Sequence, residues 1–198
     1  MIVITADQRA SRVSRDLVPD AMSQIASIAG EATVLAPERA AGDEIQMVVS
    51  SGQAAAAIVL ELTRHEEWSV GVGVGTVETP LPDSVRAARG PAFVNARDAV
   101  ERAKRTATHV AVTAEGPDHA EAVLRLLVEF RMRRTPEGWE VHDLLRDGLT
   151  QRESAERLGI TEGAVSRRVS AAGLRSENAA LPAAAHLITE LDCGSSAR

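Results

Sequence analysis

Two acidic positions near the start of the chain could bind a metal ion. Asp7 ends the apolar run that opens the sequence, and Asp43 follows small residues in the stretch RAAGDEIQMVV, residues 39–49. Apolar runs bounded by turn residues predict strands, so Asp43 should lie at the tip of a hairpin. Two carboxylates that meet at strand ends suit Mg²⁺ or Mn²⁺, which prefer oxygen ligands and often share them with a nucleotide's phosphates. Asp7 and Asp43 are therefore candidate metal ligands. The alternative is a polar hairpin tip and a strand-end carboxylate with no ligand.

A second set of candidate residues lies in the stretch TQRESAERLGITEGAVSRRV, residues 150–169. Thr150 and Glu153 form a capping box, which predicts that a helix begins at the next residue. Gly159 supplies a tight turn, and Thr161 can cap a second helix. This pattern predicts a helix-turn-helix, in which the second helix enters the major groove of DNA.

The second helix of this motif should have one buried and one exposed face. Val165 and Val169 stand four residues apart and therefore share the buried face. Ser166 and Arg167 remain toward solvent and are the first choices for contacts with bases or phosphates. The candidate DNA contacts are Thr150, Gln151, Arg152, Thr161, Ser166, Arg167 and Arg168. The alternative is a helical hairpin used only for packing or dimerisation.

The stretch LTQRESAERLGITEGAVSRRV resembles the helix-turn-helix of bacterial regulators of the sigma-factor region 4, LuxR and MarR types. The resemblance implies double-stranded DNA as a partner. Residues 137–176 carry six arginines against seven acidic residues, so one copy should bind DNA weakly. We therefore expect a homodimer.

The elements that must position Asp7 and Asp43 alternate over the first two thirds of the chain. Apolar runs and helical spacing predict the order β-α-β-β-α-β-α-β-α up to residue 134. A strand, a helix, a hairpin, a helix and a strand form the ferredoxin-like or palm arrangement, in which the first strand lies beside the hairpin. We predict an α+β fold: a palm sheet with helices on one face, followed by a small all-α helix-turn-helix domain.

The predicted organisation has three parts. Residues 1–134 form the palm domain, for sensing or dimerisation, and residues 135–176 form the DNA-binding domain, whose support helix starts at Thr135 and Pro136. Residues 177–198 are an alanine-rich tail with a short helix or disorder, and we expect the last few residues to be disordered.

The strand WSVGVGVGTV, residues 68–77, alternates valine with glycine. Glycine weakens a strand unless another backbone or a ligand comes close. The stretch therefore predicts a close approach on one face of the sheet.

Composition limits the classes of function. The chain has 198 residues, a net charge of −6 and 2% aromatic residues, so it is neither a polycation that coats DNA nor a stacking platform for single strands. A single cysteine, Cys193, excludes an intrachain disulfide framework. There is no apolar run of membrane-spanning length and no signal-peptide pattern. We expect a cytoplasmic protein without membrane partners.

The hairpin segment, with Arg39, Gly42, Asp43 and Glu44, resembles the signature hairpin of nucleotidyl cyclases of the GGDEF type. The resemblance implies that the hairpin acid binds metal with a first-strand aspartate, and that Arg39, Gly42 and Glu44 bind a nucleotide. The stretches ITADQRASR, AGDEIQ, WSVGVGVG and GPAFVNARDAVERA together resemble SatD-type bacterial proteins, which have a cyclase-like region and a C-terminal helix-turn-helix.

Several positions depart from the cyclase pattern. Ala41 and Ile45 replace the first glycine and the phenylalanine of the hairpin, and the expected arginine falls at Ala99. Phosphoryl transfer needs several groups that stabilise charge on the transferring phosphoryl, and few are offered here. We therefore assign no catalytic residue and expect a DNA-binding transcriptional regulator with a sensory or dimerising palm domain. A metal-dependent nucleotidyl cyclase regulated by its helix-turn-helix is the alternative.

Overall fold

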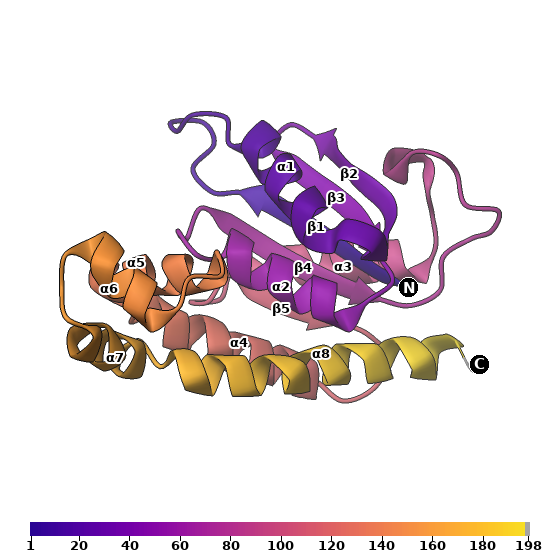
Figure 1. Ribbon diagram of the computed structural model, residues 1–198. Coiled ribbons are helices and arrows are strands. Elements are labelled where there is room, and N and C mark those ends of the chain that lie inside the picture. The colour runs from indigo at the N-terminus through magenta and orange to yellow at the C-terminus, as the bar shows by residue number, and fades with distance from the viewer. Residues whose placement is uncertain (197–198) are drawn as a thin grey trace.

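The computed structural model describes residues 1–196, which form an α+β fold with a five-stranded mixed sheet (Figure 1). The strands are β1 (Ile2–Gln8), β2 (Thr33–Ala41), β3 (Glu44–Val49), β4 (Trp68–Val74) and β5 (Val110–Thr113). The helices are α1 (Val18–Ala29), α2 (Gly52–Leu62), α3 (Pro91–Ala103), α4 (His119–Met132), α5 (Pro136–Arg146), α6 (Gln151–Leu158), α7 (Glu162–Ala171) and α8 (Leu174–Ser196). The element order predicted up to residue 134 is confirmed.

The sheet has the strand order β2-β3-β1-β4-β5. β1 is antiparallel to both β3 and β4, β2 is antiparallel to β3, and β5 is parallel to β4. The predicted hairpin is therefore confirmed as β2 and β3, which turn at Gly42 and Asp43 beside β1. The register places Asp7 opposite Glu44, the residue that follows the tip.

Helices cover both faces of the sheet (Figure 1), so the prediction that they lie on one face was wrong. α1, α2, α4 and α8 pack on the face that carries Ile2 and Ile4, while α3 packs on the face that carries Val3. The reason is that β1 is apolar on both sides and that α3 connects β4 to the parallel strand β5. A parallel pair needs a crossover, and here the crossover helix lies opposite the other helices.

The alternating glycines of β4 let α3 lie directly against the sheet. A Cβ on Gly71 would lie 2.2 Å from the Val100 nitrogen, and one on Gly73 would lie 2.1 Å from the Ala96 nitrogen. α3 meets them with small buried residues, Ala92, Ala96, Ala99 and Ala103. The predicted close approach is therefore confirmed, and the approaching group is a helix backbone.

The short helices α5, α6 and α7 pack around a small core of their own at one end of the sheet. Its buried members are Val141, Ala155, Val165, Val169, Ala172 and Leu174. α5 begins after Thr135, whose side chain accepts a hydrogen bond from the Gly138 nitrogen at 3.3 Å, as Thr135 and Pro136 predicted.

The C-terminal segment forms a 23-residue helix, α8, which is longer than the short helix expected there. Ala184 and Ile188 are fully buried in the main core, so α8 lies along α2 and α4 (Figure 1). Gly52 at the start of α2 meets the Ala185 carbonyl so closely that a Cβ would lie 2.2 Å away. The last few residues were expected to be disordered. Two of them, residues 197 and 198, lie outside the described residues. Within residues 1–196, none of the helices combines the length and apolarity needed to span a membrane.

Candidate functional site

The predicted capping box at Thr150 and the helix that begins after it are confirmed. The Thr150 hydroxyl accepts a hydrogen bond from the Glu153 nitrogen at 3.2 Å, and the Glu153 carboxylate accepts one from the Thr150 nitrogen at 2.7 Å. The hydrogen bonds from the backbone and side chain of Thr150 lower the pKa of Glu153 because they stabilise its ionised form. Such reciprocal capping satisfies backbone donors at the beginning of α6.

The turn and the second helix also follow the prediction. Gly159 adopts the left-handed conformation with φ of 66°, which glycine reaches without a Cβ penalty. The Thr161 hydroxyl accepts a hydrogen bond from the Ala164 nitrogen at 3.2 Å and thereby caps α7. Val165 and Val169 are buried against Ala155 in the small core. Local sequence signals therefore describe this motif correctly.

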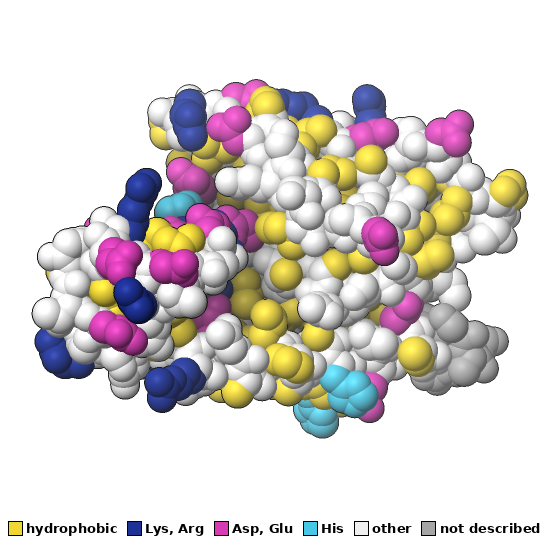
Figure 2. Space-filling view, viewed as in Figure 1, with side chains coloured by type: hydrophobic (Ala, Val, Ile, Leu, Met, Phe, Trp, Pro, Cys, Tyr) yellow, Lys and Arg dark blue, Asp and Glu magenta, His cyan; other side chains and the backbone are white. Residues whose placement is uncertain are grey.

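The candidate DNA contacts lie at the start of α6 and along α7. Arg167 is exposed and has no hydrogen-bond or ion-pair partner within residues 1–196, and Ser166 beside it is half-buried. Arg168 instead pairs with Glu140 of α5 at 2.9 Å, and Arg152 pairs with Glu156 at 3.3 Å. Thr150 and Thr161 form the two caps, and Gln151 begins α6. Figure 2 shows that arginine and acidic side chains are mixed over this end of the molecule.

The acidic residues at the hairpin face α3 and its cations. The Asp7 carboxylate lies 2.9 Å from the Lys104 ammonium, which also contacts Glu101 at 2.9 Å. The Glu44 carboxylate is buried and lies 3.2 Å from the Arg97 guanidinium. Asp7 and Glu44 share this face because they are opposite each other in the register of β1 and β3. We call Asp7, Glu44, Arg97, Glu101 and Lys104 the hairpin cluster.

Protonation in the hairpin cluster reflects burial and pairing. Burial raises the pKa of Glu44, and the nearby charge of Asp7 adds to this effect against the opposing charge of Arg97. Burial lowers the pKa of Lys104, but hydrogen bonds to Glu101 and Asp7 outweigh it, so that the pKa is raised overall. The carboxylate of Asp7 therefore has a partner that is charged at neutral pH.

The structure does not bring Arg39 to Asp7. The Arg39 guanidinium donates to the Gly42 carbonyl at 2.7 Å and also binds Asp16, which lowers the pKa of Asp16. The half-buried Asp43 uses its backbone carbonyl to accept a hydrogen bond from the Gln8 nitrogen at 3.2 Å. Among residues 1–196, no group of three or more histidine, cysteine or acidic side chains is arranged to hold a metal ion.

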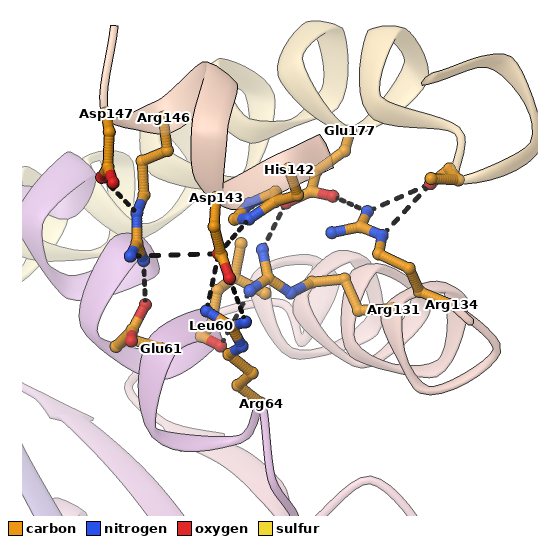
Figure 3. A network of polar contacts seen from close by, with 11 residues as sticks. Leu60, Glu61, Arg64, Arg131, Arg134, His142, Asp143, Arg146, Asp147 and Glu177 are labelled. Carbon is orange, nitrogen blue, oxygen red and sulfur yellow. Dashed lines mark hydrogen bonds and ion pairs between the residues drawn. The ribbon is translucent and has the colours of Figure 1, made fainter. Parts of the chain in front are cut away.

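A third group of polar residues, which the sequence did not single out, joins α5 and α8 to the sheet part of the molecule (Figure 3). The Glu177 carboxylate, in the first turn of α8, binds the guanidinium groups of both Arg131 and Arg134 from the end of α4. All three side chains are at least nine-tenths buried. Burial by itself raises the pKa of Glu177, but the two arginines outweigh it and lower the pKa overall.

The same junction contains a second ion pair and an aromatic ring. Arg64, just after α2, donates to both carboxylate oxygens of Asp143 in α5, at 2.8 Å and 2.6 Å. The guanidinium groups of Arg64, Arg134 and Arg131 lie 4.4, 4.5 and 4.8 Å from the centre of the Trp139 ring, within the range of cation–π attraction. We call Arg64, Arg131, Arg134, Trp139, His142, Asp143 and Glu177 the junction network.

Histidine and aspartate in the junction network are both shifted toward lower pKa values. Burial lowers the pKa of His142, and the charges of Arg131 and Arg134 lower it further against its hydrogen bond with Asp143. Burial would raise the pKa of Asp143, but its hydrogen bonds with Arg64 and His142 lower it overall. A neutral imidazole and an ionised carboxylate therefore coexist at neutral pH. The arginine-rich end of α4 and the tryptophan were the only sequence signals of this arrangement.

Comparisons of the chain with protein-family models, with curated proteins and with solved structures found no significant match.

Proposed function

We propose that this protein is a DNA-binding transcriptional regulator that acts in the cytoplasm. The observation that carries the proposal is the geometry of α6 and α7. They have a reciprocal cap at Thr150, a left-handed glycine in the turn, a capped second helix with buried valines, and an exposed Arg167 that has no ion-pair partner among residues 1–196. These features support a separate helix-turn-helix domain whose second helix enters the major groove.

The residues of this domain divide by the kind of contact they can make. Arg167 on α7 is exposed and Ser166 beside it is partly exposed, and both read base edges or adjacent phosphates. Gln151 and Arg152, with Thr150 as the cap, present the N-terminus of α6 to the DNA backbone, where free N–H groups attract phosphate. Thr161 presents the N-terminus of α7 in the same way. Arg168 reaches a phosphate only by leaving Glu140.

A homodimer on double-stranded DNA follows from the charge balance. Six arginines against seven acidic residues in residues 137–176 leave one copy without a net positive charge. Phosphate contacts contribute most of the affinity of such domains, so two copies on two half-sites compensate for the weakness of each.

The N-terminal part fits a sensory or dimerisation role in this proposal. Its first four strands have the connections and antiparallel pairing of a ferredoxin-like or palm sheet, to which α3 and β5 are added. The order supports the resemblance to SatD-type proteins and to the cyclase palm. Because Lys104 and Arg97 already neutralise Asp7 and Glu44, we propose that this palm is non-catalytic.

The test is a fluorescence-anisotropy titration of the protein with a duplex from the promoter of its own gene, repeated at several salt concentrations. Arg167→Ala should weaken binding at least tenfold, which corresponds to the loss of one good base or phosphate contact. Arg105→Ala removes the same charge from an exposed position after α3 and should leave the affinity unchanged. Equal affinities of the Arg167→Ala variant and the unmodified protein would contradict the proposal.

A metal-dependent nucleotidyl cyclase, or a palm that binds a nucleotide effector, is the second candidate. It is favoured by the buried Glu44 with its raised pKa, which stands beside Asp7 at the hairpin. Incubation with ATP or GTP and Mn²⁺ should then release pyrophosphate. A nucleotide-dependent rise in melting temperature that disappears in Asp43→Ala would support binding without turnover. If the unmodified protein shows neither pyrophosphate release nor a nucleotide-dependent rise in melting temperature, this candidate is excluded.

A further inference from the structure

An open cleft of about 770 Å³ lies between the sheet part of the molecule and the C-terminal helices. One wall consists of α1 and α2, including Ile28, Ala57 and Leu60, and the other consists of α5 and α8, including Leu145 and Leu181. Figure 2 shows a hollow with hydrophobic side chains between the smaller lobe and the main body. Its volume falls within the range of small-molecule sites in proteins.

The charged residues of this cleft are already matched with one another. Arg131 is paired with Glu177, and Arg146 of α5 reaches across to Glu61 of α2 at 3.0 Å. Arg146 also lies within 4.0 Å of Asp143 and Asp147. An ionic ligand would have to break one of these pairs and leave its partner uncompensated in a partly buried place.

The remaining polar groups of the cleft are uncharged. Ser23, Gln24 and Ser27 on α1 and Asn178 on α8 are exposed side chains that can donate and accept hydrogen bonds. His142, which also lines the cleft, is neutral at neutral pH because burial and two arginines lower its pKa. The lining therefore combines an apolar floor with neutral hydrogen-bonding groups.

We propose that this cleft binds an uncharged, largely apolar small molecule that carries a few hydrogen-bonding groups. The apolar walls would bury most of the ligand, and the serine and amide side chains of α1 and α8 would orient it. This site differs from the hairpin cluster, which lies on the opposite face of the sheet with α3.

The ligand would contact the helices on both sides of the cleft. α1 and α2 belong to the sheet part, while α5 packs against α7 and α8 follows α7 directly. A molecule held between these walls therefore acts on the same helices that set the placement of α6 and α7. That consequence rests on the proposed function, whereas binding in the cleft does not.

The test compares two fluorescent probes on the full chain, without DNA. Nile red is uncharged and apolar, and 8-anilinonaphthalene-1-sulfonate is apolar but anionic. We expect Nile red to bind saturably with a dissociation constant in the micromolar range and the anionic probe to bind at least tenfold more weakly. Equal affinity for the two probes would overturn the assignment of an uncharged ligand, and no saturable binding would overturn the site.

Two substitutions that fill the cleft locate the bound probe. Ala57→Trp on α2 and Ser27→Trp on the exposed surface of α1 should each weaken Nile red binding at least tenfold. Val94→Trp, on the exposed side of α3, is the matched control and should leave binding unchanged. If the Ser27→Trp variant melts like the unmodified protein and binds Nile red equally well, the probe occupies another surface and the proposal is wrong.

A last titration separates this inference from the proposed function. The promoter duplex is titrated with and without saturating Nile red, and we expect the dissociation constant for DNA to change at least threefold. If the dye binds saturably in the cleft but the protein does not bind DNA, the ligand site is supported and the proposed function as a regulator is wrong. If the protein binds DNA but not the dye, the proposed function is supported and the ligand site is wrong.

Discussion

The hairpin cluster and the junction network are both built from arginine or lysine and carboxylates, yet their surroundings differ. In the junction network, the Arg134, Arg131 and Glu177 side chains are 1%, 7% and 5% exposed. In the hairpin cluster, the Arg97 side chain is 59% exposed and that of Lys104 is 34% exposed. Cations that remain in water interact more weakly with a carboxylate than cations that are buried with it.

The pKa of the buried Glu44 in the hairpin cluster is shifted in the opposite direction to those of the junction carboxylates. Glu177 and Asp143 have lowered pKa values because their arginine partners outweigh burial, whereas burial raises the pKa of Glu44 despite Arg97. The folded state therefore favours the ionised carboxylates of the junction and disfavours that of Glu44. We infer that the junction network holds the C-terminal helices in place, and that the hairpin cluster contributes little to stability.

The largest effect is expected from removing the central acid of the junction. Glu177→Ala leaves two buried guanidinium groups without their carboxylate and should lower the free energy of unfolding by about 3–5 kcal/mol. Glu129→Ala removes an acid whose pair with Arg133 is exposed, and should cost less than about 1 kcal/mol. Urea denaturation measures both values. Equal costs would mean that burial does not distinguish the two pairs.

A smaller loss is expected from the second ion pair of the junction. Arg64→Ala removes two charge-assisted hydrogen bonds to Asp143 and one cation–π contact with Trp139, and should cost about 1.5–3 kcal/mol. Arg133→Ala removes the same positive charge from an exposed position and should change the free energy of unfolding by less than about 0.5 kcal/mol. Thermal unfolding followed by circular dichroism distinguishes them, and an unchanged melting curve for Arg64→Ala would contradict the role of this pair.

Acidification should weaken the junction gradually. The folded-state pKa values of His142, Glu177 and Asp143 all lie below their ordinary values of 6.5, 4.5 and 3.8. The unfolded chain therefore takes up protons first as the pH falls, so stability is fully present at neutral pH and declines below about 6.5 and again below about 4.5. Urea midpoints between pH 7 and pH 4 measure this decline. The decline above pH 5 should become smaller in His142→Gln but should not vanish, because burial also lowers the pKa of His109. An unchanged decline in this variant would exclude His142 as a cause.

The smallest effect is expected at the hairpin, and its sign is opposite. Because the pKa of Glu44 is raised in the folded state, its contribution to stability falls as the pH rises from 4.5 through the folded-state pKa. Glu44→Gln removes this buried charge and should leave the free energy of unfolding at pH 7 unchanged or raise it by about 1 kcal/mol. A loss of several kcal/mol, measured by urea denaturation, would show that the hairpin cluster is a structural element like the junction.

The parts of the molecule that followed from sequence are those that depend on neighbours within a few residues. The capping box at Thr150, the left-handed turn at Gly159 and the buried pair Val165 and Val169 all involve groups three or four positions apart. The hairpin at Gly42 is equally local. Helical and strand periodicity likewise depend on short spacing, which explains why the element order up to residue 134 was correct.

The failures involve contacts between distant parts of the chain. The second layer of helices was missed because a run such as that of β1 shows that both faces are apolar without showing what covers them. α8 was expected as a short helix or a disordered tail, but the alanines favour a helix and the 23-residue helix accommodates Pro182. Its burial of Ile188 depends on α2 and α4. The prediction that Asp7 and Asp43 bind a metal ion stays a prediction, but it did not include the Lys104 side chain, which lies 97 residues after Asp7 in the sequence and 2.9 Å from its carboxylate.

The sequence by itself therefore determined the caps of α6 and α7 with the glycine turn between them, the order of strands and helices up to residue 134, and the acidic hairpin tip. Only the tertiary structure decided which charges are buried together. Arg131 and Glu177 are 46 residues apart, and Arg64 and Asp143 are 79 residues apart, so each looks like an ordinary solvated side chain in the sequence. Packing of α8 against α2 and α4 buries Arg131 and Glu177, and the cost of burying an unpaired charge then requires each to find its partner. The partly exposed Asp143 of α5 meets the mostly buried Arg64 side chain in the same way.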